Sequence, residues 1–124
     1  MPYLNITTNA PVNKRQKETI ERAISKAILL IPKEKEELLM VNFEDCASLS
    51  LSGDFSTPAA MIELRVHNDV IEMNEAELLE KVMSLATEVV SKVLDICPDR
   101  IYCTMPAVPY WTAAGLEILK GILK

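Results

Sequence analysis

The sequence is poor in the side chains that bind metals or act as nucleophiles. It contains one histidine, His67, and three cysteines, Cys46, Cys97 and Cys103. No two of these cysteines have CxxC spacing, and one histidine with three scattered thiols does not make the ligand pattern of a zinc site. We therefore expect no metal and no other cofactor. We interpret the cysteines as buried structural thiols, because free cysteine is among the most buried residue types.

The sequence also lacks an excess of positive charge and any long apolar run. It has 13 Lys and Arg against 18 Asp and Glu, a net charge of −5, which argues against nucleic acid and anionic membranes as partners. The longest apolar run, residues 27–31, is far shorter than the roughly 18–20 residues of a membrane span. No signal peptide is evident, so the cytosol is the expected location. This length predicts a single domain over residues 1–124.

The first part of the chain has the pattern of a β-α-β unit. Residues 3–8 alternate as a strand, and Asn13 with Gln16 makes a start typical of a capping box. Apolar residues then recur at helical spacing up to residue 31. The apolar run 38–43 predicts a well-buried strand that completes the unit.

The second part repeats this order. Residues 59–66 predict a strand, Asn74 with Glu77 predicts the start of a long amphipathic helix, and residues 100–105 predict the closing strand. A last amphipathic segment, residues 113–124, is interpreted as a helix. We thus expect an α+β fold in which two β-α-β repeats form a four-stranded mixed sheet. Right-handed crossovers place both helices on one face of that sheet.

The face of the sheet without helices is expected to be mixed in polarity. By alternation, Ile62, Leu64 and Val66 point to the helices and their neighbours point away. The side chains expected on the outer face are Tyr3, Asn5, Thr7, Glu63, Arg65, Tyr102 and Thr104. A face that is neither dry nor simply solvated predicts a homo-oligomer whose sheets face one another.

Pro2 follows Met1 directly and opens the first strand. A small second residue permits removal of the initiator methionine, which leaves Pro2 with a free secondary amine. An α-amino group titrates near about pH 7.7–8.0 in free peptides, and burial in an apolar pocket disfavours its charged form. Because Met-Pro is also a common start without any chemistry, Pro2 needs further support from the rest of the sequence.

Several short motifs, in a consistent order, supply that support. They are Met1-Pro2, Thr8-Asn9-Ala10-Pro11, Pro32-Lys33, Ser52-Gly53, Ser56-Thr57-Pro58 and Pro98-Asp99-Arg100-Ile101-Tyr102. With them the sequence resembles the macrophage migration inhibitory factor (MIF) group of the tautomerase superfamily, from residue 2 to about residue 111. The resemblance implies the MIF fold, a homotrimer with active sites between subunits, and keto-enol tautomerase activity of the phenylpyruvate and dopachrome type. The implied substrate is a small aromatic 2-keto acid.

The resemblance also implies roles for individual residues. Pro2 is the general acid-base that takes a proton from the carbon next to a ketone. Lys33 matches a lysine at the pocket mouth that pairs with the substrate carboxylate, although by itself it could equally complete a helix C-terminus. His67 falls where a backbone amide contacts ligand, and its side chain is expected at the surface. Tyr102 matches a tyrosine that the neighbouring subunit contributes.

Three features depart from the family pattern. Thr104 stands where the family often has asparagine, which changes a hydrogen bond to the substrate. No CxxC follows Pro58, so thiol-disulfide activity is not implied. The segment after Tyr102 is shorter than in the family, and residues 113–124 do not resemble the family's tail. Trp111 therefore either walls the site or packs at an interface, and we favour packing.

Two other functions are kept as hypotheses. One is a MIF-like cytokine that binds a host receptor and has only vestigial tautomerase activity, since some such proteins leave cells without a signal peptide. The other is dehalogenation or hydration by an amino-terminal proline. It is disfavoured because those enzymes surround the proline with arginines, whereas Arg65 and Arg100 are the only arginines beyond the first predicted helix.

Overall fold

The computed structural model describes residues 2–119 and 122–123. In chain order the elements are β1 (Tyr3–Thr8), α1 (Lys14–Ile28), η1 (Glu36–Leu38), β2 (Met40–Glu44), β3 (Ala60–His67), α2 (Asn68–Met73), α3 (Ala76–Leu94), η2 (Pro98–Arg100), β4 (Ile101–Thr104), β5 (Ala107–Val108), β6 (Thr112–Ala113), β7 (Leu116–Leu119) and β8 (Ile122–Leu123). The elements η1 and η2 are single 3₁₀ turns that lead into β2 and β4. No helix in this described part of the chain is both long and apolar enough to cross a membrane.

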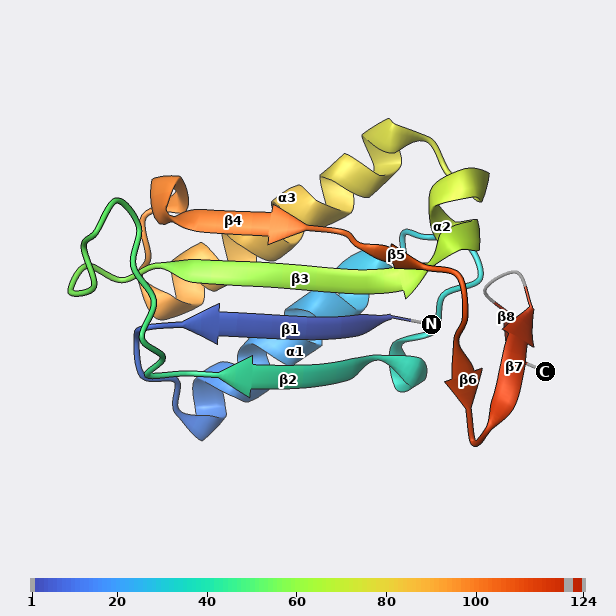
Figure 1. Cartoon of the computed structure of the whole chain (residues 1–124), viewed down its shortest axis with the longest axis horizontal. Helices are drawn as coiled ribbons and strands as arrows, with labels where there is room; N and C mark the ends of the chain where they lie inside the picture. The colour runs from blue at the N-terminus through green and yellow to red at the C-terminus, as the bar shows by residue number, and fades with distance from the viewer. Residues whose placement is uncertain (1, 120–121, 124) are drawn as a thin grey trace.

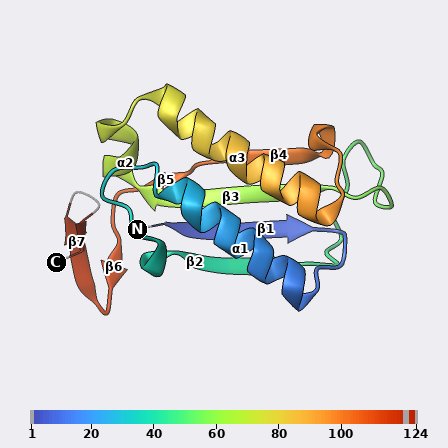
Figure 2. The ribbon, with the colours of Figure 1, turned by 180° about the vertical axis from the view of Figure 1, so that it is seen from behind.

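The main sheet has the strand order β2-β1-β3-β4, with the short β5 pairing beside β3. The pairs β1–β2 and β3–β4 are parallel, and the central pair β1–β3 is antiparallel. Helices α1 and α3 lie together on one face of this sheet, behind it in Figure 1 and in front of it in Figure 2. The predicted α+β architecture of two β-α-β units and a mixed sheet is therefore confirmed.

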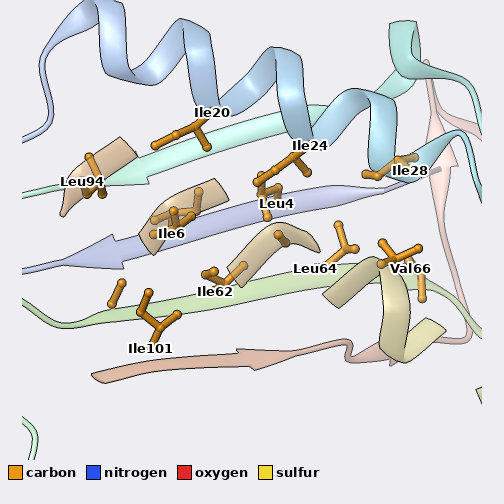
Figure 3. Packing of buried hydrophobic residues seen from close by; sticks show 14 of the residues in the cluster. Leu4, Ile6, Ile20, Ile24, Ile28, Ile62, Leu64, Val66, Leu94 and Ile101 are labelled. Atoms are coloured by element: carbon orange, nitrogen blue, oxygen red, sulfur yellow. The ribbon is translucent and has the colours of Figure 1, made fainter. Parts of the chain in front are cut away.

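The core lies between the helices and the inward face of the sheet (Figure 3). Most of its largest fully buried side chains come from β1, α1, β3 and α3: Leu4, Ile6, Ile20, Ile24, Ile28, Ile62, Leu64, Val66 and Val82. Ile31 and Ile96, in the connections after α1 and α3, complete the set. Side chains that alternate with these along β3 face the other way, as the partly exposed Glu63 and the exposed Arg65 show. The predicted division of the two sheet faces is confirmed for β3.

The start of α1 follows the prediction, whereas the start of α3 does not. The Asn13 Oδ1 accepts a hydrogen bond from the Gln16 N–H at 2.8 Å, and the Gln16 Oε1 accepts one from the Asn13 N–H at 2.9 Å. Asn74, predicted to open the second long helix, instead donates its amide to the Val70 carbonyl at 2.9 Å and closes the short helix α2. The N-cap of α3 is Glu75, which makes no side-chain capping bond.

The predicted helix over residues 113–124 is wrong. The described part of this segment forms β6, β7 and β8, which pair as antiparallel strands; residues 120, 121 and 124 lie outside the described residues. Ala114 and Gly115 connect β6 to β7 with φ values of 54° and 75°. Two consecutive residues with positive φ are the geometry of a tight hairpin turn, so the glycine here directs a reversal of the chain.

Strand β2 is less buried than its apolar sequence suggests. Its residues alternate between exposed and partly buried, and Met40 is 67% exposed. The prediction of a well-buried strand is wrong for the protomer because β2 lies at the edge of the sheet, where only Val41 and Phe43 pack against the core. Its other face carries the exposed Met40, Asn42 and Glu44 and remains open to a partner.

The two helix starts give a matched test of capping. Asn13→Ala should lower the free energy of unfolding by about 1 kcal/mol, because it removes a side chain that satisfies an otherwise unpaired N–H. Glu75→Ala, at an N-cap without a capping bond, should change it by less than about 0.5 kcal/mol. Urea unfolding of both variants followed by circular dichroism measures the difference, and equal losses would contradict this account of α1.

Candidate active site

Pro2 is buried where the first strand begins, and it lines an open cavity of about 640 Å³. Its carbonyl accepts a hydrogen bond from the Met40 N–H at 3.3 Å, which ties the start of the chain to the start of β2. The cavity is lined by Pro2, Tyr3, Glu37, Leu38, Leu39, Met40, Trp111, Thr112, Ala113 and Ala114. Most of these residues are apolar, and Glu37 is the one ionised group among them.

Three segments that are distant in the sequence meet at this cavity. They are the beginning of β1, the turn η1 with the first residue of β2, and the stretch from Trp111 through β6. Figure 1 shows β6 beside the marked N-terminus and the start of β2. The cavity thus has an indole wall on one side. Trp111 lines the cavity, in agreement with one of its two predicted roles, and its packing at a subunit interface stays a prediction.

Arg65 is a cation close to this cavity that sequence reasoning did not assign to the site. It is paired with Tyr3 across β1 and β3, and its guanidinium lies 5.7 Å from the centre of the Tyr3 ring. Its Nη2 is 3.6 Å from the Glu63 Oε2. The signal that could have found it was the alternation along β3, which already placed Arg65 on the same face as Tyr3.

Lys33 does not line the Pro2 cavity. It is an exposed residue in the turn after α1, with a φ of 72°. It lines a separate cavity of about 70 Å³ together with Asp69 of helix α2 and with Asn74, the C-cap of that helix. The structure therefore places Lys33 beside α2, a helix that the sequence analysis did not predict.

His67 is buried, with 8% of its surface exposed, so the expectation of a surface side chain is wrong. It ends β3 and is the N-cap of α2, where its Nδ1 accepts a hydrogen bond from the Asp69 N–H at 3.2 Å. Its Nε2 lies 3.1 Å from the Pro109 carbonyl oxygen. The Asp69 Oδ2 is 3.5 Å from Nδ1 and has no hydrogen-bond partner among the described atoms. A ring with polar partners on both nitrogens is a structural element here.

Tyr102 and Thr104 are exposed on the outer face of β4, far from Pro2 within one protomer. Tyr102 is in register with Met61, whereas Tyr3, which follows Pro2, is in register with Arg65. At about 3.3 Å per residue these two positions are roughly 13 Å apart along β3. Pro2 and Tyr102 of the same chain therefore cannot contact one small substrate.

The loop that precedes β3 is held beside Tyr102 by part-buried and exposed hydrogen bonds to charged side chains. The Arg100 guanidinium donates to the carbonyls of Pro58, Asp54 and Thr57 at 3.0–3.1 Å. The Asp54 carboxylate accepts hydrogen bonds from the Thr57 side chain and from the Ser56 and Thr57 backbone, which hold its pKa at about 2. Two of the short motifs thus act together to fix the loop.

The cysteines have different surroundings. Burial against α3 raises the pKa of the Cys103 thiol to about 11, although a hydrogen bond with Thr87 opposes this, so the thiol is protonated at neutral pH. Cys46 and Cys97 are exposed, which contradicts the expectation that all three thiols are buried. In the described part of the chain no three His, Cys, Asp or Glu residues lie together as a metal site.

Comparison with known proteins supports the fold. Neither a protein-family model nor a curated protein matches the sequence. Solved structures do match: MIF2 of Leishmania major has a TM-score of 0.82 at 17% identity, covering 95% of this chain and 97% of its own. A MIF homologue from Prochlorococcus marinus has a TM-score of 0.78 at 21% identity, covering 93% and 97%. A fused 4-OT symmetric trimer has a TM-score of 0.72 at 14% identity, covering 86% and 85%.

The chain has the fold of the MIF structures that it matches. The fold expected from the resemblance is confirmed. Within the MIF-like protomer the structure brings Pro2 and Trp111 to one cavity and places Arg65 nearby. It leaves Lys33, Tyr102 and Thr104 outside that cavity.

The low pKa of Asp54 predicts a specific loss of stability in acid. Because its pKa is lowered from 3.8 to about 2 in the folded state, its contribution is present above pH 4 and is lost as the pH falls toward 2. The free energy of unfolding of Asp54→Asn should therefore fall less steeply between pH 4 and pH 2 than that of the wild type. Asp99→Asn, at an exposed carboxylate outside the loop, should keep the wild-type slope. Urea titrations at several pH values measure these slopes, and identical slopes for wild type and Asp54→Asn would refute the assignment.

Proposed function

We propose that this protein is a keto-enol tautomerase that uses Pro2 as its general acid-base after removal of Met1. The observation that carries the proposal is the burial of Pro2 in a largely apolar cavity of about 640 Å³. Such a cavity lies within the usual size range for small-molecule sites. Its apolar lining disfavours a charged amine, an effect that the exposed Glu37 carboxylate in the same lining opposes, and we propose that the apolar lining dominates and leaves the freed Pro2 nitrogen neutral.

The reaction requires only a proton transfer. The neutral Pro2 nitrogen takes a proton from the carbon next to the ketone, and the electron pair of that C–H bond moves to form the enolate. The ammonium form of Pro2 then delivers a proton to the enolate oxygen, so the base is restored and no oxidant or cofactor is consumed. A positioned acid-base group of this kind contributes roughly 10²–10⁴-fold to the rate.

The proposed substrate is a small aromatic 2-keto acid. The indole of Trp111 and the side chains of Leu38 and Leu39 offer an apolar surface to an aryl group. We assign the carboxylate to Lys33, which lies beside α2 in the protomer, so that its flexible side chain has to turn toward the Pro2 cavity when substrate binds. Arg65 is a second cation near the cavity. The backbone of His67 is assigned a contact with ligand, as the resemblance implies.

The proposed functional unit is a homotrimer whose sites lie between subunits. Two features support it: Tyr102 and Thr104 are exposed on the face without helices, and β2 is an uncovered edge with an exposed Met40. A neighbouring protomer would bring Tyr102 and Thr104 to the Pro2 cavity. One structurally similar protein, the fused 4-OT, is itself a symmetric trimer. Because Pro2 and Tyr102 of one chain are separated along β3, a site that contains both needs two chains.

The role of Pro2 is tested with two forms of the protein that lack its free secondary amine. A form that retains Met1 carries an amide in place of the amine, so its conversion of phenylpyruvate should fall by about 10²–10⁴-fold. Pro2→Gly keeps a small second residue for methionine removal and should also lose activity, because it replaces the secondary amine by a primary one. Mass spectrometry identifies the start of each chain, and the keto-enol assay by absorbance gives the rates. Wild-type rates in both forms would refute the proposal.

The shared site is tested by mixing two defective chains. Co-expression of Pro2→Gly with Tyr102→Ala gives mixed oligomers in which Pro2 of one chain can meet Tyr102 of another. Their activity should exceed that of either variant alone. The matched control co-expresses Pro2→Gly with the Pro2→Gly, Tyr102→Ala double variant, which can form no intact site. Mixed oligomers no more active than this control would show that Pro2 and Tyr102 do not share a site.

A further inference from the structure

The His67 ring joins three parts of the chain: the end of β3, the start of α2 and the segment after β5. The residue ends β3, its Nδ1 caps α2 through the Asp69 N–H at 3.2 Å, and its Nε2 lies 3.1 Å from the Pro109 carbonyl oxygen. A carbonyl oxygen can only accept, and a backbone N–H can only donate. The Nε2 therefore donates its proton to Pro109, while Nδ1 accepts from the Asp69 N–H and has the Asp69 Oδ2 3.5 Å away. This leaves the buried ring with a single orientation.

The contact with Pro109 ties the segment between β5 and Trp111 to the end of β3. Strand β5 pairs with the end of β3, where Val108 is in register with His67. After β5 the chain runs through Pro109 and Tyr110, which are both exposed, and Tyr110 is 85% exposed. Trp111 follows at once and lines the Pro2 cavity. In Figure 1 this segment leaves β5 next to α2 and then turns to β6.

We propose that His67 is a positioning residue for the Pro2 cavity. Its Nε2–H holds the Pro109 carbonyl and thereby sets the place of Trp111, which forms the wall for the aryl group of the substrate. This inference deepens the proposed function and rests on it for the substrate, whereas the placement of Trp111 does not depend on any activity. The role belongs to the side chain of His67, and it is distinct from the backbone contact that the family resemblance implies.

Two substitutions separate the roles of the two ring nitrogens. In His67→Asn the shorter amide oxygen reaches the position of Nδ1, so it keeps the cap on α2 and loses the bond to Pro109. In His67→Gln the longer amide reaches the position of Nε2, so its N–H keeps the bond to Pro109 and loses the cap. Neither amide titrates. We call the hydrogen bond from Nε2 to the Pro109 carbonyl the tether and the bond from the Asp69 N–H to Nδ1 the cap. The two variants separate the tether from the cap with side chains of the same chemistry.

Fluorescence of Trp111 reports the tether without any substrate, because Trp111 is the sole tryptophan of the chain. His67→Asn should shift its emission to longer wavelength and increase its quenching by acrylamide, and His67→Gln should keep both near the wild-type values. Circular dichroism and the oligomeric mass of each variant confirm that the comparison is made on folded, equally assembled protein. Wild-type emission in His67→Asn, or an equal shift in both variants, would overturn the role of the tether.

Kinetics with phenylpyruvate test the consequence for the site. His67→Asn should raise KM on the order of five- to tenfold, the effect of losing about one hydrogen bond, with kcat within about twofold. His67→Gln should restore KM. Trp111→Ala should raise KM as well, and adding His67→Asn to it should have little further effect, because both changes remove the same wall. Additive effects would overturn the proposal. An inactive wild type with the predicted fluorescence shifts would instead refute the tautomerase function and leave the positioning of Trp111 intact.

Discussion

The antiparallel pairing of β1 with β3 is the interaction on which the rest of the structure depends. It joins the two β-α-β units at the centre of the sheet, with a register that runs from Tyr3 opposite Arg65 to Thr8 opposite Ala60. Within each unit the strands are parallel, so both crossover helices fall on one face and enclose a single core. The same register brings the start of the chain next to the end of β3. Without it Pro2 would have neither a wall nor a cation near it.

The candidate site forms near the end of β3 because several chain segments begin or end there. The start of β1 supplies Pro2, the turn before β2 supplies apolar side chains, and β5 and β6 carry Trp111 across the end of β3. Helix α2 begins directly after β3 and takes its cap from His67. A chain with few catalytic side chains can in this way present one buried proline in an apolar cavity. The chemistry we assign to it needs a positioned amine and little else.

Local signals predicted much of the fold and rather less of the site. The alternation in β1 and β3 and the box formed by Asn13 and Gln16 act through neighbouring residues, and they were confirmed. Asn74 failed as a helix start because its amide serves the helix before it, a choice that the pattern alone leaves open. The amphipathic pattern of residues 113–124 did not separate a helix from short strands. The segment forms a hairpin because two residues with positive φ reverse the chain in the turn after β6.

The sequence alone determined the two repeated units and the division of the sheet into an apolar and a polar face. It also pointed to Pro2 as the candidate catalytic residue. These follow from spacing and residue type, which act over a few residues. Only the tertiary structure decided that Trp111 walls the Pro2 cavity, that Lys33 lies beside α2, and that the ring of His67 is buried between β3 and Pro109. Those contacts join residues far apart in the chain. Their geometry depends on the register of the sheet and on where each connection crosses its edge.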